Sequence, residues 1–213
     1  MKLYDITLPI SEDLPVWPDD SPIKLSLAFD LSEGDAANVT AIQMSAHTGT
    51  HIDAPRHFIP EGLAVDQLPL DRLIGPCRVV DLLHLKTSID PADLEILDLK
   101  DITRLLFKTQ NSLREAYRKQ PFQSDYIALS PQAAAYLKNE NIQLIGIDAF
   151  SIEAYENIDH ATHHILLKNN VIIIEGLDLK DVPAGDYELI ALPIKLKDAD
   201  GAPTRVVLRE LSA

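Results

Sequence analysis

Short apolar runs rich in β-branched residues recur along this chain, and they constrain its fold more than any other feature. Runs of about four to eight such residues between turn-forming segments are typical of buried β-strands. The clearest of them span residues 77–83, 102–109, 143–148 and 171–177. The segments between them carry helix signals, such as Ser130 followed by Pro131, but helices and strands do not alternate as regular βαβ units. The pattern predicts an α/β fold built on a mixed sheet, and it argues against a TIM barrel or a regular doubly wound sheet.

The chain is 213 residues long, and no linker, change of composition or internal repeat divides it. Its apolar fraction of 46% is that of an ordinary globular protein. A chain of this length can bury a full hydrophobic core in one unit. We therefore expect residues 1–213 to form a single domain, with residues 111–122 as a helical or irregular insertion.

The charge balance excludes several kinds of partner. Lys and Arg number 19 against 33 Asp and Glu, which gives a net charge of −14. Nucleic-acid binding depends mainly on Lys and Arg that neutralise phosphates, so it is not expected here. The sequence has no basic amphipathic segment that would bind a membrane surface and no apolar run of about 20 residues that would span a membrane. Cys77 is the only cysteine and the first residues lack the apolar stretch of a signal peptide, so we expect a soluble, cytoplasmic protein.

Three of the seven histidines lie within eleven residues. His47, His51, Asp53 and His57 all occupy odd positions, and they continue the polar face of an alternating segment that begins at Val39. In an extended chain these side chains would point in one direction, and a glycine and a proline between them can bend the segment into a concave site. Imidazole nitrogens with a carboxylate suit Zn²⁺ or another borderline divalent metal. A metal site is therefore a better explanation than a solvated loop that happens to hold histidines.

Glu175 is a second anomaly, because it interrupts the apolar run at residues 171–177. A buried carboxylate needs an Arg, a hydrogen-bond network or a metal; the alternative is that Glu175 lies at the exposed end of the strand. Twelve residues earlier, His163 belongs to a second histidine group with His160 and His164. Helical periodicity alone does not decide which of these three faces inward.

Other catalytic motifs find no support in the sequence. There is no Gly-x-Ser-x-Gly element for a serine hydrolase and no Gly-rich phosphate loop for a dinucleotide. Cys77 lies at the start of an apolar run, where a cysteine is more often part of the core than a nucleophile. The histidine and carboxylate groups remain the candidates for function.

The segment from His47 to His57 reads HTGTHIDAPRH, and it resembles the signature His-x-Gly-Thr-His-x-Asp-x-Pro-x-His of the cyclase family of metal-dependent hydrolases. That family includes bacterial kynurenine formamidases, also called arylformamidases, and isatin hydrolases. Further segments resemble family motifs in the same order along the chain. They are WPDDSP at residues 17–22, GIDAFS at 146–151, and the pair formed by His163 and the EGL at 175–177. At Asp19 the family often has Gly, and Asp tolerates a left-handed turn less freely.

The resemblance implies a swivelling β/β/α fold, usually assembled as homodimers or tetramers, and a site for two metal ions per chain. His47, His51 and Asp53 would hold the first ion. Asp53 would bridge to the second, which His163 and Glu175 would also hold. Zinc is the expected metal, with manganese as the second choice.

The same resemblance implies that His57 is an acid/base without a metal of its own. In an arylformamidase Trp17 would form a wall for an aryl ring; the alternative is an ordinary, partly buried tryptophan. A divalent metal lowers the pKa of bound water, and an imidazole can protonate a leaving amine near neutral pH. The expected reaction is therefore amide hydrolysis, with N-formyl-kynurenine giving kynurenine and formate. Two alternatives stay open: hydrolysis of a cyclic, isatin-like amide, or a metal-binding protein without activity. A closed structural zinc site would leave no spare His57, and the roles of Arg56 and of residues 111–125 are open.

Overall fold

The structure is a computed structural model that describes residues 1–114, 118 and 120–211. Within these residues the strands are β1 (Leu3–Asp5), β2 (Lys24–Phe29), β3 (Val39–Gln43), β4 (His51–Asp53), β5 (Ile74–Asp81), β6 (Arg104–Lys108), β7 (Leu144–Ile147), β8 (Ile172–Glu175), β9 (Gly185–Pro193) and β10 (Gly201–Glu210). The α-helices are α1 (Leu70–Leu73), α2 (Pro91–Glu95), α3 (Asn111–Arg114), α4 (Pro131–Asn139) and α5 (Ala161–Lys168). Short 3-10 helices are η1 (Leu31–Glu33), η2 (Pro55–His57) and η3 (Val65–Gln67). α3 begins the insertion predicted at 111–122, of which residues 115–117 and 119 lie outside the described residues.

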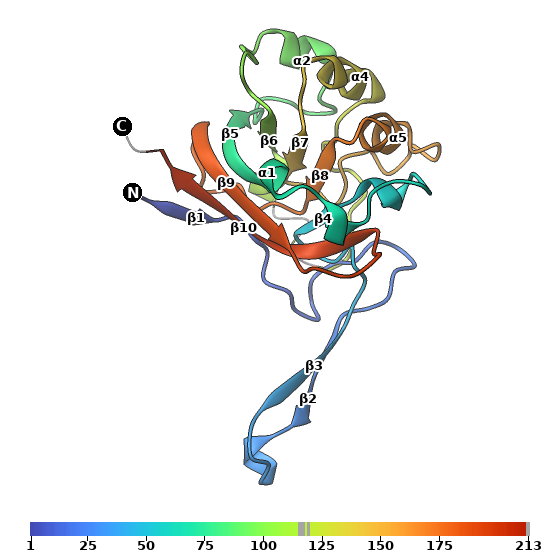
Figure 1. Ribbon diagram of the computed structural model, residues 1–213, viewed down its shortest axis with the longest axis vertical. Helices are drawn as coiled ribbons and strands as arrows, with labels where there is room; N and C mark the ends of the chain where they lie inside the picture. The colour runs from blue at the N-terminus through green and yellow to red at the C-terminus, as the bar shows by residue number, and fades with distance from the viewer. Residues whose placement is uncertain (115–117, 119, 212–213) are drawn as a thin grey trace.

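The large sheet closes into a barrel (Figure 1). Its strand order is β1-β10-β4-β8-β7-β6-β5-β9, and β9 also pairs with β10, so seven strands of the described chain form a closed ring and β1 is an extra strand beside β10. β5, β6, β7 and β8 run parallel, whereas β4, β9 and β10 pair antiparallel with their neighbours. The predicted α/β fold with a mixed sheet is confirmed, and its closure into a barrel is an addition that depends on pairing between distant strands.

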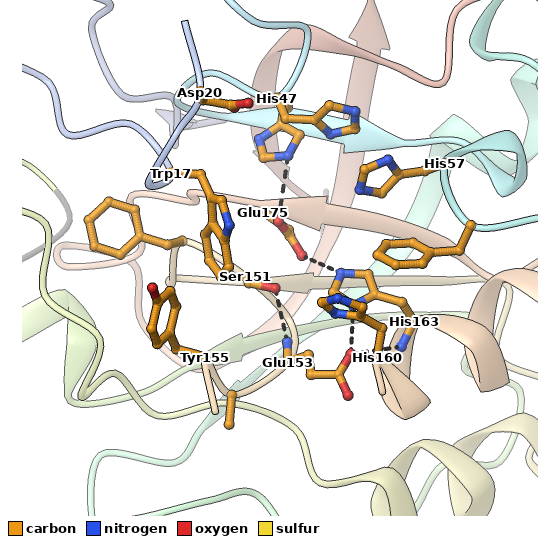
Figure 2. Close-up of a pocket in the computed structure, with 14 residues that line it drawn as sticks. Trp17, Asp20, His47, His57, Ser151, Glu153, Tyr155, His160, His163 and Glu175 are labelled. Carbon is orange, nitrogen blue, oxygen red and sulfur yellow. Dashed lines mark hydrogen bonds and ion pairs between the residues drawn. The ribbon is translucent and has the colours of Figure 1, made fainter. Parts of the chain in front are cut away.

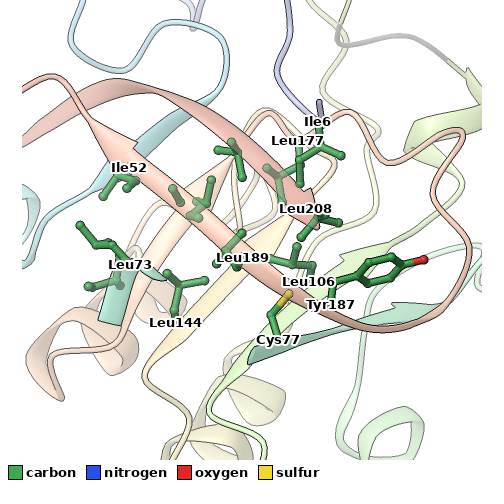
Figure 3. Packing of buried hydrophobic residues seen from close by; sticks show 14 of the residues in the cluster. Ile6, Ile52, Leu73, Cys77, Leu106, Leu144, Leu177, Tyr187, Leu189 and Leu208 are labelled. Atoms are coloured by element: carbon green, nitrogen blue, oxygen red, sulfur yellow. The ribbon is translucent and has the colours of Figure 1, made fainter. Parts of the chain in front are cut away.

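Both faces of β6, β7 and β8 are buried, which explains their continuous apolar runs. Leu106 and Leu144 point into the barrel, where they pack with Leu189 of an antiparallel strand (Figure 3). Because side chains alternate along a strand, the next residues, Phe107 and Ile145, belong to a second cluster on the other face of the sheet. That second cluster includes the buried apolar residues of α2, α4 and α5, so these helices cover the outside of the parallel strands.

Cys77 lies in the barrel core, and burial raises the pKa of its thiol to about 12. The thiol therefore stays protonated and acts as a core side chain, as the sequence predicts. None of the helices in the described part of the chain is long and apolar enough to traverse a lipid bilayer.

β2 and β3 form a separate two-stranded ribbon that projects from the barrel (Figure 1). The alternation that begins at Val39 predicts a strand that continues into the histidine segment, and this prediction is wrong. β3 ends at Gln43, and the chain turns before it reaches β4. All residues of β2 and β3 are exposed, so the alternating pattern belongs to the ribbon and not to the strand that carries the histidines.

Candidate metal centre

β4 and β8 are neighbouring strands of the barrel, and they carry the centre of the site. Because side chains alternate along a strand, His51 and Asp53 share one face of β4, while Ile52 between them is fully buried in the core. The antiparallel register sets Glu175, the last residue of β8, directly opposite His51. His51, Asp53 and Glu175 are 3%, 1% and 4% exposed. Glu175 is therefore a buried carboxylate and does not lie at an exposed strand end.

A tight turn ahead of β4 places His47. The Thr50 hydroxyl donates to the carbonyl of Gly176 and accepts from the amide of Leu8. Gly49 and Gly176 approach so closely that a Cβ on Gly176 would collide with the Gly49 carbonyl. Both glycines have positive φ angles, 64° and 68°, a conformation that glycine adopts without strain. The Gly-Thr pair of the histidine segment thus fixes the turn that brings His47 beside β4.

His47 and His57 stack with their ring centroids 4.0 Å apart, and both lie beside Asp200, which immediately precedes β10. His47 Nδ1 is 2.8 Å from Asp53 Oδ1, and its Nε2 is 2.9 Å from Asp200 Oδ2. His57, the last residue of η2, has its Nδ1 3.4 Å from the same Asp200 oxygen. The His57 side chain is 27% exposed, so it can reach a molecule in the adjacent pocket.

α5 supplies the remaining histidine. His163 Nε2 lies 3.3 Å from Glu175 Oε1 and 3.7 Å from Asp53 Oδ2. On the other side of the ring, Nδ1 donates to Glu153 at 2.7 Å (Figure 2). Glu153 is 2% exposed and also accepts the amide of Thr162 at 2.9 Å, at the start of α5. A carboxylate on Nδ1 keeps a proton there and leaves Nε2 available to a metal.

The spacing of these donor atoms fits divalent metal ions. Two ligands about 2.1 Å from a tetrahedral ion lie about 3.4 Å from each other. His51 Nε2 is 3.3 Å from Asp53 Oδ1 and 3.5 Å from Glu175 Oε2. His163 Nε2 is 3.7 Å from Asp53 Oδ2 and 3.3 Å from Glu175 Oε1, the other oxygens of the same two carboxylates. Asp53 Oδ2 is buried and has no hydrogen-bond partner among the described residues. A buried carboxylate oxygen without a hydrogen bond is costly, and a bound cation would offset that cost.

The surrounding carboxylates keep two of the histidines charged in the metal-free site. Burial alone would lower the pKa of His47, but its hydrogen bonds to Asp53 and Asp200 raise that pKa to about 9. Burial likewise opposes the charge on His163, and its glutamate partners raise its pKa to about 10. For His57 burial prevails and lowers the pKa, so this imidazole is neutral near pH 7.

These residues border a pocket of about 280 Å³ (Figure 2). One wall of the pocket is aromatic. Trp17, Phe150 and Tyr155 line it, and Trp17 and Tyr155 have ring centroids 5.3 Å apart. Phe122 packs against this wall, with ring centroids 5.4 Å from Trp17 and 4.6 Å from Phe150. The loop of Trp17 includes Asp19, whose φ of 71° is the left-handed turn that the sequence predicts. The volume and the aromatic wall suit a small molecule with a flat ring.

The predicted site residues come together around this pocket. Those that line it or lie on its floor are Trp17, His47, His51, Asp53, His57, His163 and Glu175. In the second histidine group, His163 is the buried member, His164 is exposed, and His160 lies at the exposed rim of the pocket. Arg56 points toward the backbone carbonyls of the neighbouring loops and away from the pocket lining.

Sequence reasoning misses Glu153 and Asp200. Each is a single acid among the 33 acidic residues of the chain, and neither stands in a recognisable pattern. Glu153 lies in the middle of the loop between β7 and α5, five residues after Asp148, and Asp200 belongs to the connection between β9 and β10. Only the folded chain brings them to the histidines.

A mixed α/β barrel whose buried histidine and carboxylate donors lie beside an open pocket is typical of proteins with a metal site. This chain belongs to the Cyclase family, whose model, described as "Putative cyclase", matches residues 4–154. The kynurenine formamidase of Bacillus thuringiensis (strain Al Hakam) is 38% identical over 207 residues, which cover 97% of each chain. The solved structure of a potential metal-dependent hydrolase with cyclase activity has 39% identity and a TM-score of 0.86, and the match covers 100% of this chain and 99% of that one.

Isatin hydrolase A from Labrenzia aggregata has the same fold, with a TM-score of 0.82 and 24% identity over 97% of this chain and 93% of that one. The family expected from the histidine segment is therefore confirmed, by the family model over residues 4–154 and by relatives that match nearly the whole chain.

Proposed function

We propose that this protein is a metal-dependent amide hydrolase of the arylformamidase type, which converts N-formyl-kynurenine into kynurenine and formate. The observation that carries this proposal is the combination, in one pocket, of a metal-donor cluster, a spare neutral histidine and an aromatic wall. The 38% identity to a kynurenine formamidase over nearly the full length supports the same reaction here.

The metal content we propose is two zinc ions per chain. His47, His51 and Asp53 would hold one ion, and His163 and Glu175 would hold the other together with Asp53. The Asp53 oxygen that lacks a hydrogen bond supports the role of Asp53 as the shared ligand. A divalent metal, when bound, supplies water of lowered pKa and a Lewis acid for a carbonyl oxygen.

We assign the proton transfer to His57. Its imidazole is neutral near pH 7, so it can accept a proton and later pass it on. Asp200, 3.4 Å from Nδ1, orients the ring. When the C–N bond of the formamide breaks, the nitrogen needs a proton to leave as an amine, and His57 at the pocket wall is placed to deliver it. The formyl carbon then departs as formate with the oxygen of water.

We assign the recognition of the aryl ring to the aromatic wall around Trp17. Offset and edge-on contacts between rings are favourable by about 0.5–1.5 kcal/mol each. The wall lies on the opposite side of the pocket from His57, so a ring held there extends its substituent toward the donor cluster (Figure 2). The narrow volume of about 280 Å³ excludes large peptides from this arrangement.

The test is a comparison of substrates on purified, zinc-loaded protein. N-formyl-kynurenine and formylanilines should be hydrolysed with release of formate, and activity should disappear after chelation and return with zinc. A cyclic amide of the isatin type serves as the control. Faster turnover of the cyclic amide, or metal-independent formate release, would contradict the proposal.

We further infer that residues 1–213 act as one catalytic domain and that the active species is a homo-oligomer, most simply a dimer. Symmetric dimers are the commonest assemblies of soluble proteins. Neither inference is needed for the chemistry, since the described residues of one chain contain every group named above.

A further inference from the structure

Asp20 is an acid at the pocket that the proposed reaction does not use. It lines the same cavity as the metal donors, and it is partly buried. The other acids that line the described part of this cavity, Glu153 and Glu175, both accept hydrogen bonds from buried backbone amides. The Asp20 side chain has no hydrogen bond and no ion pair with any described residue. A carboxylate that is partly withdrawn from water and has no partner in the protein is suited to bind a cationic group of a ligand.

The backbone fixes Asp20 beside Trp17. The segment from Trp17 to Asp20 is a β-turn, in which the Asp20 amide donates to the Trp17 carbonyl at 3.0 Å. Pro18 occupies the second position of this turn, and Asp19, with a φ of 71°, occupies the third, which is the arrangement of a type II turn. Figure 2 shows the Trp17 and Asp20 side chains on the same side of the pocket. One short turn therefore presents both an aromatic ring and a carboxylate to a bound molecule.

The charged groups of the pocket favour a positively charged ligand group at this position. Among the described residues that line the pocket there is no Lys or Arg. Its histidines are the proposed metal ligands, the proposed acid/base His57, and His160 at the exposed rim. An ammonium group of a ligand therefore finds a free carboxylate at Asp20, whereas a carboxylate of a ligand finds no permanently charged side chain.

The substrate of the proposed function carries such an ammonium group. In N-formyl-kynurenine the formamide and an acyl side chain are attached to neighbouring carbons of the aryl ring, and the side chain ends in an amino-acid group. When the ring lies on the wall around Trp17 with its formamide toward the metal donors, the side chain is left to extend along that wall. Asp20 closes the turn that carries Trp17, so it lies where the ammonium can form a charge-assisted hydrogen bond.

We propose that Asp20 is a specificity-determining residue, which selects aryl formamides whose side chain carries an ammonium group. This inference rests on the proposed function, and it names the part of the substrate that Asp20 binds. The substrate carboxylate is not required for this contact, so N-formyl-kynuramine, which has the amine and lacks the carboxylate, is also a substrate. An analogue of N-formyl-kynurenine that keeps the carboxylate and has hydrogen in place of the amine binds more weakly.

Steady-state kinetics on zinc-loaded protein with these three substrates test the assignment. Asp20→Asn should raise KM for the two amines about tenfold to a hundredfold, the usual contribution of a hydrogen bond to a charged group, with little change in kcat. KM for the analogue without the amine should stay the same. Asn has the shape of Asp, and the Asp20 side chain has no hydrogen bond within the described chain to lose, so the variant should keep its fold.

Asp19→Asn is the matched control, because it removes the same charge one position earlier. Asp19 is exposed and is not among the described residues that line the pocket, and Asn tolerates its positive φ. This variant should leave all three KM values unchanged. The proposal is overturned if Asp20→Asn has no effect, if it affects the analogue without the amine equally, or if Asp19→Asn has the same effect.

Binding without turnover separates this inference from the proposed function. Trp17 is the only tryptophan of the chain, so its fluorescence reports a molecule at the aromatic wall. Kynurenine should bind the zinc-loaded protein about tenfold or more tightly than its analogue without the amine, and Asp20→Asn should remove this difference. If kynurenine binds in this way but no formamide is hydrolysed, the proposed function alone is refuted. If formamides are hydrolysed and the difference is absent, the role of Asp20 alone is refuted.

Discussion

Replacing Glu153 by Gln should weaken the site without touching a proposed metal ligand. The two Glu153 oxygens have different partners: Oε1 accepts the Thr162 amide at 2.9 Å, and Oε2 accepts His163 Nδ1 at 2.7 Å. Gln offers one oxygen, so it satisfies only one of them. If it keeps Thr162, its amide group faces Nδ1 and favours the tautomer with a proton on Nε2, where a metal must bind. If it keeps His163, a buried amide loses its partner at a cost of about 1–3 kcal/mol.

The expected result is a loss of about tenfold to a hundredfold in metal affinity, the usual effect of removing a partner of a ligand histidine, or a comparable loss of stability. Competition with a chromophoric chelator measures the affinity, and urea unfolding of the metal-free protein measures the stability. Glu156→Gln is the matched control, because Glu156 is exposed three residues later and has no contact with the histidines. A Glu153→Gln variant with unchanged affinity and unchanged stability would refute the role of Glu153.

Three further predictions concern the same site. The Asp53→Ala variant should lose metal and activity together. The His57→Ala variant should keep its metal, and its kcat should fall by about 10²–10⁴-fold. If elemental analysis finds no metal in the His57→Ala variant, His57 is a metal ligand. His47 and His163 have pKa values raised to about 9 and 10, so both are protonated at neutral pH and a metal must displace these protons. Metal affinity should therefore rise about tenfold per pH unit for each displaced proton between pH 6 and 9, and pH-independent binding in calorimetry would contradict this. Trp17→Ala should raise KM for an aryl formamide by about tenfold with little change in kcat, and an equal effect on N-formyl-alanine would argue against ring recognition.

The grouping of the proposed metal donors could be predicted better than the backbone that carries them. The argument that residues at odd positions point in one direction holds for His51 and Asp53, which share one face of β4. Side chains two positions apart on a strand always point to the same face. It fails for His47 and His57, which lie in a turn and a 3-10 helix on either side. The sequence shows the spacing, but tertiary contacts such as Thr50 with Gly176 decide where the strand begins.

Barrel closure and the outer carboxylates could not be predicted for a related reason. β9 and β10 are both recognisable strands, but their pairing, and that of β10 with β4, joins segments that local patterns do not connect. Asp200 depends on that closure for its contact with His47, whereas Glu153 meets His163 within the segment that connects β7 to α5. By contrast, Glu175 stands out in the sequence because a charged residue within an apolar run needs a polar partner or a metal if the strand is buried.

The pairing of β4 with β8 has a consequence for the order of folding and metal binding. The Thr50 hydroxyl and the Gly176 carbonyl that join there are 126 residues apart in sequence, and the proposed donors divide in the same way between an early and a late segment. The ligands proposed for the first ion all lie in the early segment, whereas the second ion needs His163 and Glu175, which lie in the C-terminal third of the chain. Loading of the second ion must therefore follow the pairing of β4 with β8, and an ion that binds only the folded form adds about 2.7 kcal/mol to its stability at a hundred times its Kd. Starvation for the metal should thus shorten the lifetime of the protein in the cell as well as its activity.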